Sequence, residues 1–168
     1  EAVIELAGKV QHRALRVWAG KRRLRRRTLS LNQFIPKPAT PFQWHPLEDV
    51  RAVQRRIRRI AQAFRKNRSV TVLADLPKWN YVQALLSLGD RRVAEILRAV
   101  HRSGGNWPES LKAVNVNPDF YVYRRKGPDE VLPWGFIDHG VSRDLLRGEY
   151  RAALLGWVPP EGWGASGW

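Results

Sequence analysis

Four prolines within eleven residues, at positions 36, 38, 41 and 46, constrain the fold of this chain more than any other feature. Each proline removes a backbone N–H and fixes φ, so neither a helix interior nor a central strand can pass through residues 35–46. We therefore expect a stiff, extended loop there. The regular structure must come from the chain on either side of it.

The residues that flank this loop predict a strand before it and a helix after it. Residues 28–34 alternate polar and apolar side chains, which is typical of a strand. Residues 47–67 have the apolar spacing of an amphipathic helix, and residues 70–74 are typical of a buried strand. A further amphipathic helix is expected over residues 1–18, ending near Gly20.

The helix over residues 47–67 is the clearest element in the sequence. We expect its apolar face to be buried and its basic face to be exposed. The apolar face holds Leu47, Val50, Val53, Ile57, Ile60, Ala61 and Phe64, and the basic face holds Arg51, Arg55, Arg58, Arg59 and Lys66. Glu48 and Asp49 open this helix, where carboxylates favour the positive end of the helix dipole and a catalytic pair is not expected.

The alternation of helix and strand changes in the second half of the chain. Short helices are expected over residues 80–88, 91–102 and 108–114, with a last helix capped by Ser142. A short extended segment is expected at 121–123 and an irregular tail from Gly156. The fold class is therefore α/β, with parallel strands joined by a crossover helix and followed by a mainly helical C-terminal extension.

Cysteine is absent from all 168 residues, which excludes disulfides, zinc–thiolate sites, thiol nucleophiles and cysteine-ligated clusters within this chain. The four histidines form no pair at i, i+3 or i+4, so we expect surface or capping roles for them and no metal site. No apolar stretch approaches the roughly 18 residues of a membrane span, and the acidic start differs from a signal peptide. A cytoplasmic location is expected, with no membrane partner.

A formal net charge of +15 makes polyanions such as RNA the natural partners of this chain. The nucleic-acid candidates are Arg22, Arg25, Arg26, Arg51, Arg55 and Arg58. The first three lie within residues 21–27, where six of seven residues are cations. Trp44, Trp79, Trp107 and Trp134 could stack bases, although burial in a core is the favoured interpretation. Solvated arginines with no partner are the alternative interpretation of the same charge.

Three blocks of sequence resemble a large, uncharacterised group of radical S-adenosylmethionine (radical SAM) proteins. Residues 30–44, Ser-Leu-Asn-Gln-Phe-Ile-Pro-Lys-Pro-Ala-Thr-Pro-Phe-Gln-Trp, are similar to a loop of the form N-P-F-x-P-K-P-x-T-P-F-Q-W that follows a strand near the end of the catalytic barrel. Residues 76–92 and 117–142 hold the other two blocks. One departure is Gln33, which stands where the family usually has proline. Many members also carry an N-terminal cobalamin-binding-type domain.

The resemblance implies a division of the chain and a missing front part. Residues 1–75 would be the C-terminal end of a radical SAM barrel, 76–155 a helical extension and 156–168 a tail. The family's C-x-x-x-C-x-x-C loop, which binds a four-iron four-sulfur cluster and S-adenosylmethionine, would lie upstream in a parent chain. Cobalamin use is open, and methyl or sulfur transfer is the suggested chemistry. The start without methionine fits a piece of a longer chain, with no catalytic residue of its own.

The same loop supplies the candidate pocket residues. Active sites of α/β barrels collect at the carboxyl ends of strands. We therefore expect polar side chains of this loop to face cofactor or substrate, and they are Gln33, Lys37, Thr40, Gln43 and Trp44. A clamp of prolines and aromatics holding the barrel exit is the alternative. Asp138 and His139 are adjacent in sequence, so packing or capping is favoured over acid–base chemistry. A basic RNA- or ribosome-binding module remains the rival function.

Overall fold

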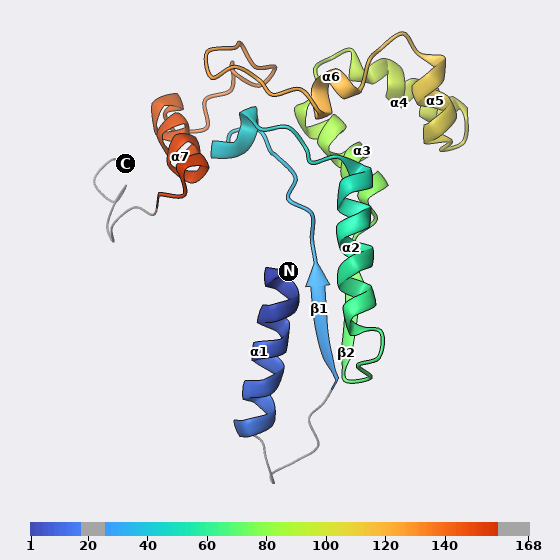
Figure 1. Ribbon diagram of the computed structural model, residues 1–168. Coiled ribbons are helices and arrows are strands. Elements are labelled where there is room, and N and C mark those ends of the chain that lie inside the picture. The colour runs from blue at the N-terminus through green and yellow to red at the C-terminus, as the bar shows by residue number, and fades with distance from the viewer. Residues whose placement is uncertain (18–25, 158–168) are drawn as a thin grey trace. The chain divides into compact units, whose positions relative to one another are not determined.

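The computed structural model describes residues 1–17 and 26–157 (Figure 1). Two compact units make up the chain: residues 1–34 with 48–81, and residues 35–47 with 82 onward. The basic positions Arg22 and Arg25 and nearly all of the glycine-rich tail lie outside the described residues. The division at 75/76 that the resemblance implies stays a prediction.

The first unit is built on a two-stranded parallel sheet. Helix α1 (Ala2–Val17) leads to β1 (Arg27–Leu31), and α2 (Val50–Phe64) connects β1 to β2 (Val70–Ala74). The two strands pair in parallel, from Arg27 opposite Val70 to Leu31 opposite Ala74. The predicted α/β class with parallel strands and a crossover helix is therefore confirmed, although most of the regular structure is helical.

Helix α2 is shorter than the predicted 47–67 because its capping residues fix its start. The Asp49 carboxylate accepts a hydrogen bond from the Ala52 backbone N–H at 2.8 Å, so the helix begins at Val50. Val53 and Phe64 are buried, while Ile57 and Ile60 are half-buried. All five residues of the predicted basic face are exposed, and Ala61 is also exposed although it was assigned to the apolar face.

Removing the cap should destabilise the first unit measurably. Replacing Asp49 with alanine is expected to cost about 1 kcal/mol of unfolding free energy, because the Ala52 N–H loses its acceptor. Glu48→Ala is the matched control, since Glu48 makes only an exposed ion pair with Arg56 and its loss should cost under about 0.5 kcal/mol. Urea-induced unfolding of both variants measures the difference. Equal losses would show that the cap adds nothing.

The two faces of the sheet differ in burial and in polarity. Leu29, Leu31, Val70 and Val72 share one face in the observed register and are half-buried. The opposite face holds Thr28, Ser30, Thr71 and Leu73, of which all but Thr71 are exposed. The helices therefore cover the apolar face and leave the more polar face open.

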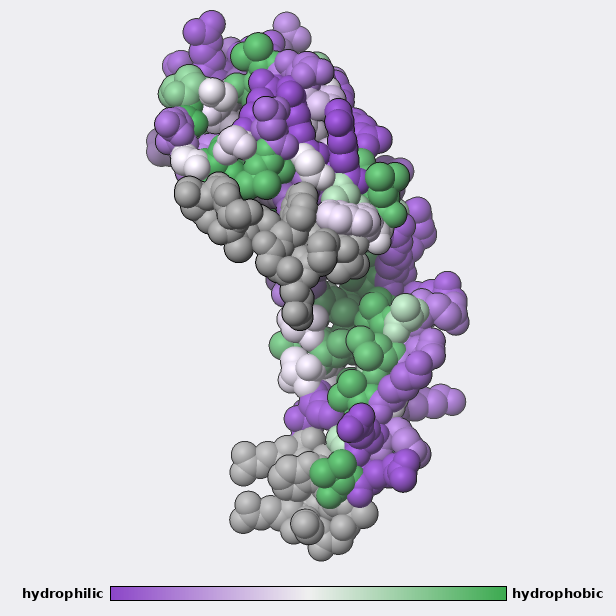
Figure 2. Space-filling model, turned by 90° about the vertical axis from the view of Figure 1, so that its left-hand side faces the viewer, coloured by the Kyte–Doolittle hydropathy of each residue, from purple (hydrophilic) through white to green (hydrophobic). Residues whose placement is uncertain are grey.

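Helix α1 lies beside α2 rather than over the open face. The Arg59 guanidinium meets the Glu1 carboxylate at 2.7 Å, and Asn67 Nδ2 donates to Gln11 Oε1 at 2.8 Å. A stripe on α1 remains exposed and apolar, and its members are Val3, Leu6, Val10 and Val17. Figure 2 shows hydrophobic side chains bordered by hydrophilic ones in the lower half of the view, where α1 lies.

Strand β1 ends at Leu31, three residues before the predicted end. The Asp75 N–H to Leu31 carbonyl bond is the last between the strands, at 3.4 Å. Gln33 is instead fixed by its side chain, since Nε2 donates to the Glu48 carbonyl at 3.2 Å and Oε1 accepts from Asn80 Nδ2 at 3.1 Å. Gln33, at the position where the family usually has proline, thus links the end of β1 to the residue before α2 and to Asn80.

The regular structure in the described part of the second unit is helical. It holds the 3-10 turn η1 (Pro41–Trp44), most of α3 (Pro77–Leu88), α4 (Val93–Arg102), α5 (Trp107–Ala113), α6 (Asp119–Val122) and α7 (Arg143–Leu155). Ser142 caps α7 as predicted, its hydroxyl accepting from the Leu145 N–H at 3.2 Å. The four helices that the sequence predicted here are present, with starts and ends that differ from the prediction by at most three residues.

Two segments of this unit differ from the prediction. The proline-rich loop is not extended throughout, because Pro41 takes the first position of a 3-10 turn, where its missing N–H is not needed. The segment expected to be extended at 121–123 is the end of a helical turn. There the Asn117 side chain accepts from the Asp119 N–H at 3.0 Å, and Pro118 presets the backbone before it.

Trp44 is the centre of a core in the second unit. It is fully buried and packs with Leu132, Leu146 and Tyr150, and Phe42, Trp134 and Val141 surround that cluster. The expectation of a buried tryptophan is confirmed at this position. It is wrong for Trp79, whose surface is 47% exposed.

Candidate functional site

The proline-rich segment is held rigid by its own side chains. Pro36 is fully buried, and the Thr40 hydroxyl donates to the Lys37 carbonyl at 2.8 Å. The Lys37 ammonium donates to the Ser87 hydroxyl on α3 at 3.0 Å. Two of the five predicted pocket residues therefore fix the loop, and neither lines the cavity described below.

Gln43 is the predicted pocket residue that does line a cavity. Its side chain is buried, and Oε1 accepts from the Trp134 indole N–H at 2.7 Å and from the Ala39 N–H at 3.3 Å. These two donors fix the amide orientation. Both bonds use the oxygen, so the Nε2 group of this cavity-lining residue remains available as a donor.

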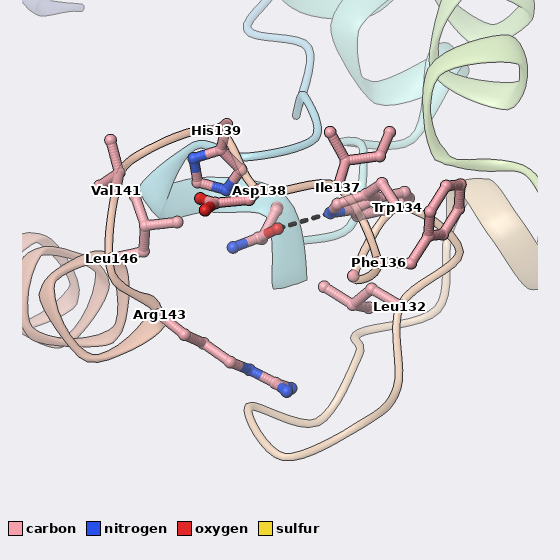
Figure 3. Close-up of a pocket in the computed structure, with 11 residues that line it drawn as sticks. Leu132, Trp134, Phe136, Ile137, Asp138, His139, Val141, Arg143 and Leu146 are labelled. Carbon is pink, nitrogen blue, oxygen red and sulfur yellow. Dashed lines mark hydrogen bonds between the residues drawn. The ribbon is translucent and has the colours of Figure 1, made fainter.

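The cavity lies between η1, the loop after Leu132 and the start of α7 (Figure 3). Its volume is about 330 Å³, at the lower end for small-molecule sites. Its lining comprises Gln43, Leu132, Trp134, Gly135, Phe136, Ile137, Asp138, His139, Val141, Arg143 and Leu146. Apolar walls thus surround a buried amide, with charged and titratable groups on the exposed side.

The residues on the exposed side also hold the loop in place. Asp138 Oδ1 accepts from the Gly140 N–H at 2.9 Å, and Gly140 has a φ of 76°, which favours glycine. Arg143 Nη2 donates to the carbonyls of Pro128 and Glu130 at 2.8 and 2.6 Å. Asp138 therefore caps a turn ahead of Ser142, as the sequence favoured, and it lines the cavity together with His139.

Trp44 does not line this cavity, and Gln33 belongs to the other unit. The indole N–H of Trp44 is buried with no hydrogen-bond partner in the described part of the chain. Its role is packing, which fits the clamp interpretation of the aromatic residues in this segment. Of the five candidate pocket residues, Gln43 is the one found in the described lining of this cavity.

Lys126 is a buried cation that sequence reasoning missed. It is 4% exposed, and its ammonium donates to the Tyr121 carbonyl at 2.9 Å. Burial lowers its pKa from 10.5 to about 8, and the nearby Arg124 adds to the effect. In the sequence Lys126 follows two arginines and resembles part of a solvated basic run. No sequence pattern therefore indicates that it is buried.

The nucleic-acid candidates lie in the first unit. Arg26, Arg51, Arg55 and Arg58 are all exposed. Across residues 1–17 and 26–157, no group of three or more His, Cys, Asp or Glu side chains is placed to hold a metal ion. No helix within those residues is long and apolar enough to cross a membrane.

Comparisons with known proteins add no relative. No family model matches the sequence, and no match was found among curated proteins or among solved structures. Function must therefore be argued from the sequence blocks and from the geometry of the two units.

Proposed function

We propose that this chain is the C-terminal portion of a radical SAM enzyme, in which it closes the barrel and contributes to substrate binding. The observation that supports the proposal is the winding of the first unit. Helix α2 packs against β2 and α1 lies beside α2, while the face of the sheet that holds Thr28, Ser30 and Leu73 is exposed.

This winding favours a barrel over a doubly wound sheet. Crossovers between parallel strands are right-handed, so β1–α2–β2 fixes the direction in which the sheet grows. Helix α1 leads into β1 on the same face, so a strand that precedes α1 would pair with the free edge of β1. Repetition of this unit gives a sheet with all helices outside, as in an α/β barrel.

The open face is suited to the inside of such a barrel. Parallel sheets are covered on both faces in globular proteins, whereas Thr28, Ser30 and Leu73 are exposed here. Further strands would enclose these side chains. They would also give the exposed apolar stripe of α1 a neighbouring helix to pack against.

The cofactor chemistry lies outside this chain. In the parent chain, cysteine thiolates would hold a four-iron four-sulfur cluster, which would supply radical chemistry by reductive cleavage of S-adenosylmethionine. No cysteine is present among the 168 residues, so this chain provides no cluster ligand. Its residues would hold the exit of β1 through Gln33 and offer the Gln43 amide in the second unit to a substrate group.

Anaerobic reconstitution tests this proposal. The complete product of the gene that encodes this chain should bind about four iron and four sulfide ions and cleave S-adenosylmethionine. The 168-residue chain alone should bind none, because it lacks every thiolate ligand. Iron and sulfide analysis of both proteins gives the result. A complete gene product without a cluster would show that the proposal is wrong.

A further inference from the structure

A strongly basic cavity lies at the amino-terminal ends of β1 and β2. Its volume is about 1240 Å³, and its lining comprises Arg26, Ala61, Phe64, Arg65, Asn67, Arg68, Ser69, Val70, Thr71 and Val72. Barrel active sites form at the opposite, carboxyl ends of strands. This basic cavity is therefore separate from the site proposed above.

The charged side chains in the described lining of the basic cavity are all positive. Arg26, Arg65 and Arg68 are exposed, and no aspartate or glutamate is part of the described lining. The loop between them is rigid, since Asn67 Oδ1 accepts from both the N–H and the hydroxyl of Ser69, at 3.1 and 2.8 Å. Three cations are thus presented from a fixed backbone.

Arg27 is half-buried and adds a further cation at the same end of the sheet, outside the described lining of the cavity. Its Nη2 donates to the Ser69 hydroxyl at 3.0 Å, while Nε and Nη1 are buried with no hydrogen-bond partner in the described part of the chain. A guanidinium with two buried N–H groups that have no partner in the described residues adds to the positive potential at this end of the sheet.

A row of arginines extends the basic cavity along α2. Arg51, Arg55 and Arg58 recur at spacings of four and three, and Arg65 follows on the same helical stripe. Over fourteen residues this row is about 21 Å long. Arg56 and Arg59 on the same helix are paired with Glu48 and Glu1, whereas the row has no carboxylate partner within the described residues.

We propose that the basic cavity and this row bind the phosphodiester backbone of a nucleic-acid strand. A single phosphate ion would use one or two of these arginines. A chain of phosphates uses all of them, because its charges repeat along a line, and each contact releases condensed counterions.

A salt titration with a fluorescent single-stranded RNA of twelve nucleotides tests the site. The variant Arg65→Ala/Arg68→Ala is expected to bind about tenfold more weakly at low salt. Its log–log salt slope should be less steep by about 1.4, because two contacts are lost. Arg55→Ala/Arg58→Ala should give a similar reduction. These four side chains are exposed, so both variants should fold, and circular dichroism checks this.

The matched control is Arg98→Ala/Arg102→Ala, which removes the same charge from exposed positions on α4 in the second unit. It should bind within about twofold of the parent chain, with an unchanged slope. Equal losses in the control and site variants would mean diffuse attraction and would overturn the proposal. Full displacement of the RNA by low-millimolar inorganic phosphate, or tighter binding to phosphatidylserine vesicles than to RNA, would overturn it as well.

Discussion

Replacing Trp44 with alanine is expected to lower the free energy of unfolding by about 3–5 kcal/mol. The side chain is fully buried and central to its cluster, and its ring centroid lies 5.7 Å from that of Tyr150. Truncation therefore removes a large apolar area and leaves a cavity between Leu132, Leu146 and Tyr150. Urea-induced unfolding, followed by circular dichroism, measures the loss.

Two further variants identify the cause of that loss. Trp79→Ala should cost under about 1 kcal/mol, because nearly half of that side chain is already exposed. Trp44→Phe should cost much less than Trp44→Ala, since it keeps an aromatic ring and removes a buried N–H that has no partner in the described part of the chain. If Trp44→Ala and Trp79→Ala were equally stable, the described core would be wrong.

The stability of the second unit is expected to rise between about pH 8 and pH 10.5 because of Lys126. Its folded-state pKa of about 8 lies below the unfolded value of 10.5, so in this window the unfolded chain binds a proton that the folded chain has released. Stability increases with pH wherever the unfolded state binds more protons. Integrated over the window, the gain is about 3 kcal/mol.

The variant Lys126→Met isolates this contribution. At pH 7 it should be about 1–2 kcal/mol more stable than the parent, since it avoids burying a charge but loses the bond to the Tyr121 carbonyl. The advantage should disappear as the pH approaches 10. Lys112→Met, at an exposed position on α5, should leave the curve parallel to that of the parent. Parallel curves for Lys126→Met would contradict the assignment.

Local signals predicted those elements whose ends are fixed by their own residues. The strand at 70–74 was placed correctly, and so was the Ser142 cap of α7. The start of α2 lay within three residues of its prediction, and the Asp49 cap places it at Val50. Amphipathic spacing also assigned the exposed arginines of α2 correctly.

Features that depend on distant contacts were not predictable. The helical turn at α6 was missed for a different reason, since the nearby Asn117 side chain favours it although the sequence Tyr-Val-Tyr alone is typical of a strand. Lys126 is buried because the chain folds back, where its backbone N–H donates to the Trp44 carbonyl at 3.0 Å. Its position after two arginines in the sequence does not indicate this burial.

The candidate site shows the same division. The sequence selected Gln43, and the cavity includes it. Its partner Trp134 lies 91 residues away, so no local pattern could pair the two. Lys37 and Thr40 are also polar in sequence. However, Thr40 bonds to a carbonyl within the loop and Lys37 bonds to α3, so both side chains hold the loop in place.

The assignment of residues 35–47 to the second unit has a consequence for how the molecule is assembled. The chain enters that unit at residue 35, leaves it after 47 and returns at 82. Trp44 is therefore synthesised long before Leu132, Leu146 and Tyr150, which enclose it. A ribosome would expose this indole for more than a hundred residues before its core could close. No single cut in the backbone separates the two units, so cleavage at one site cannot release either unit intact.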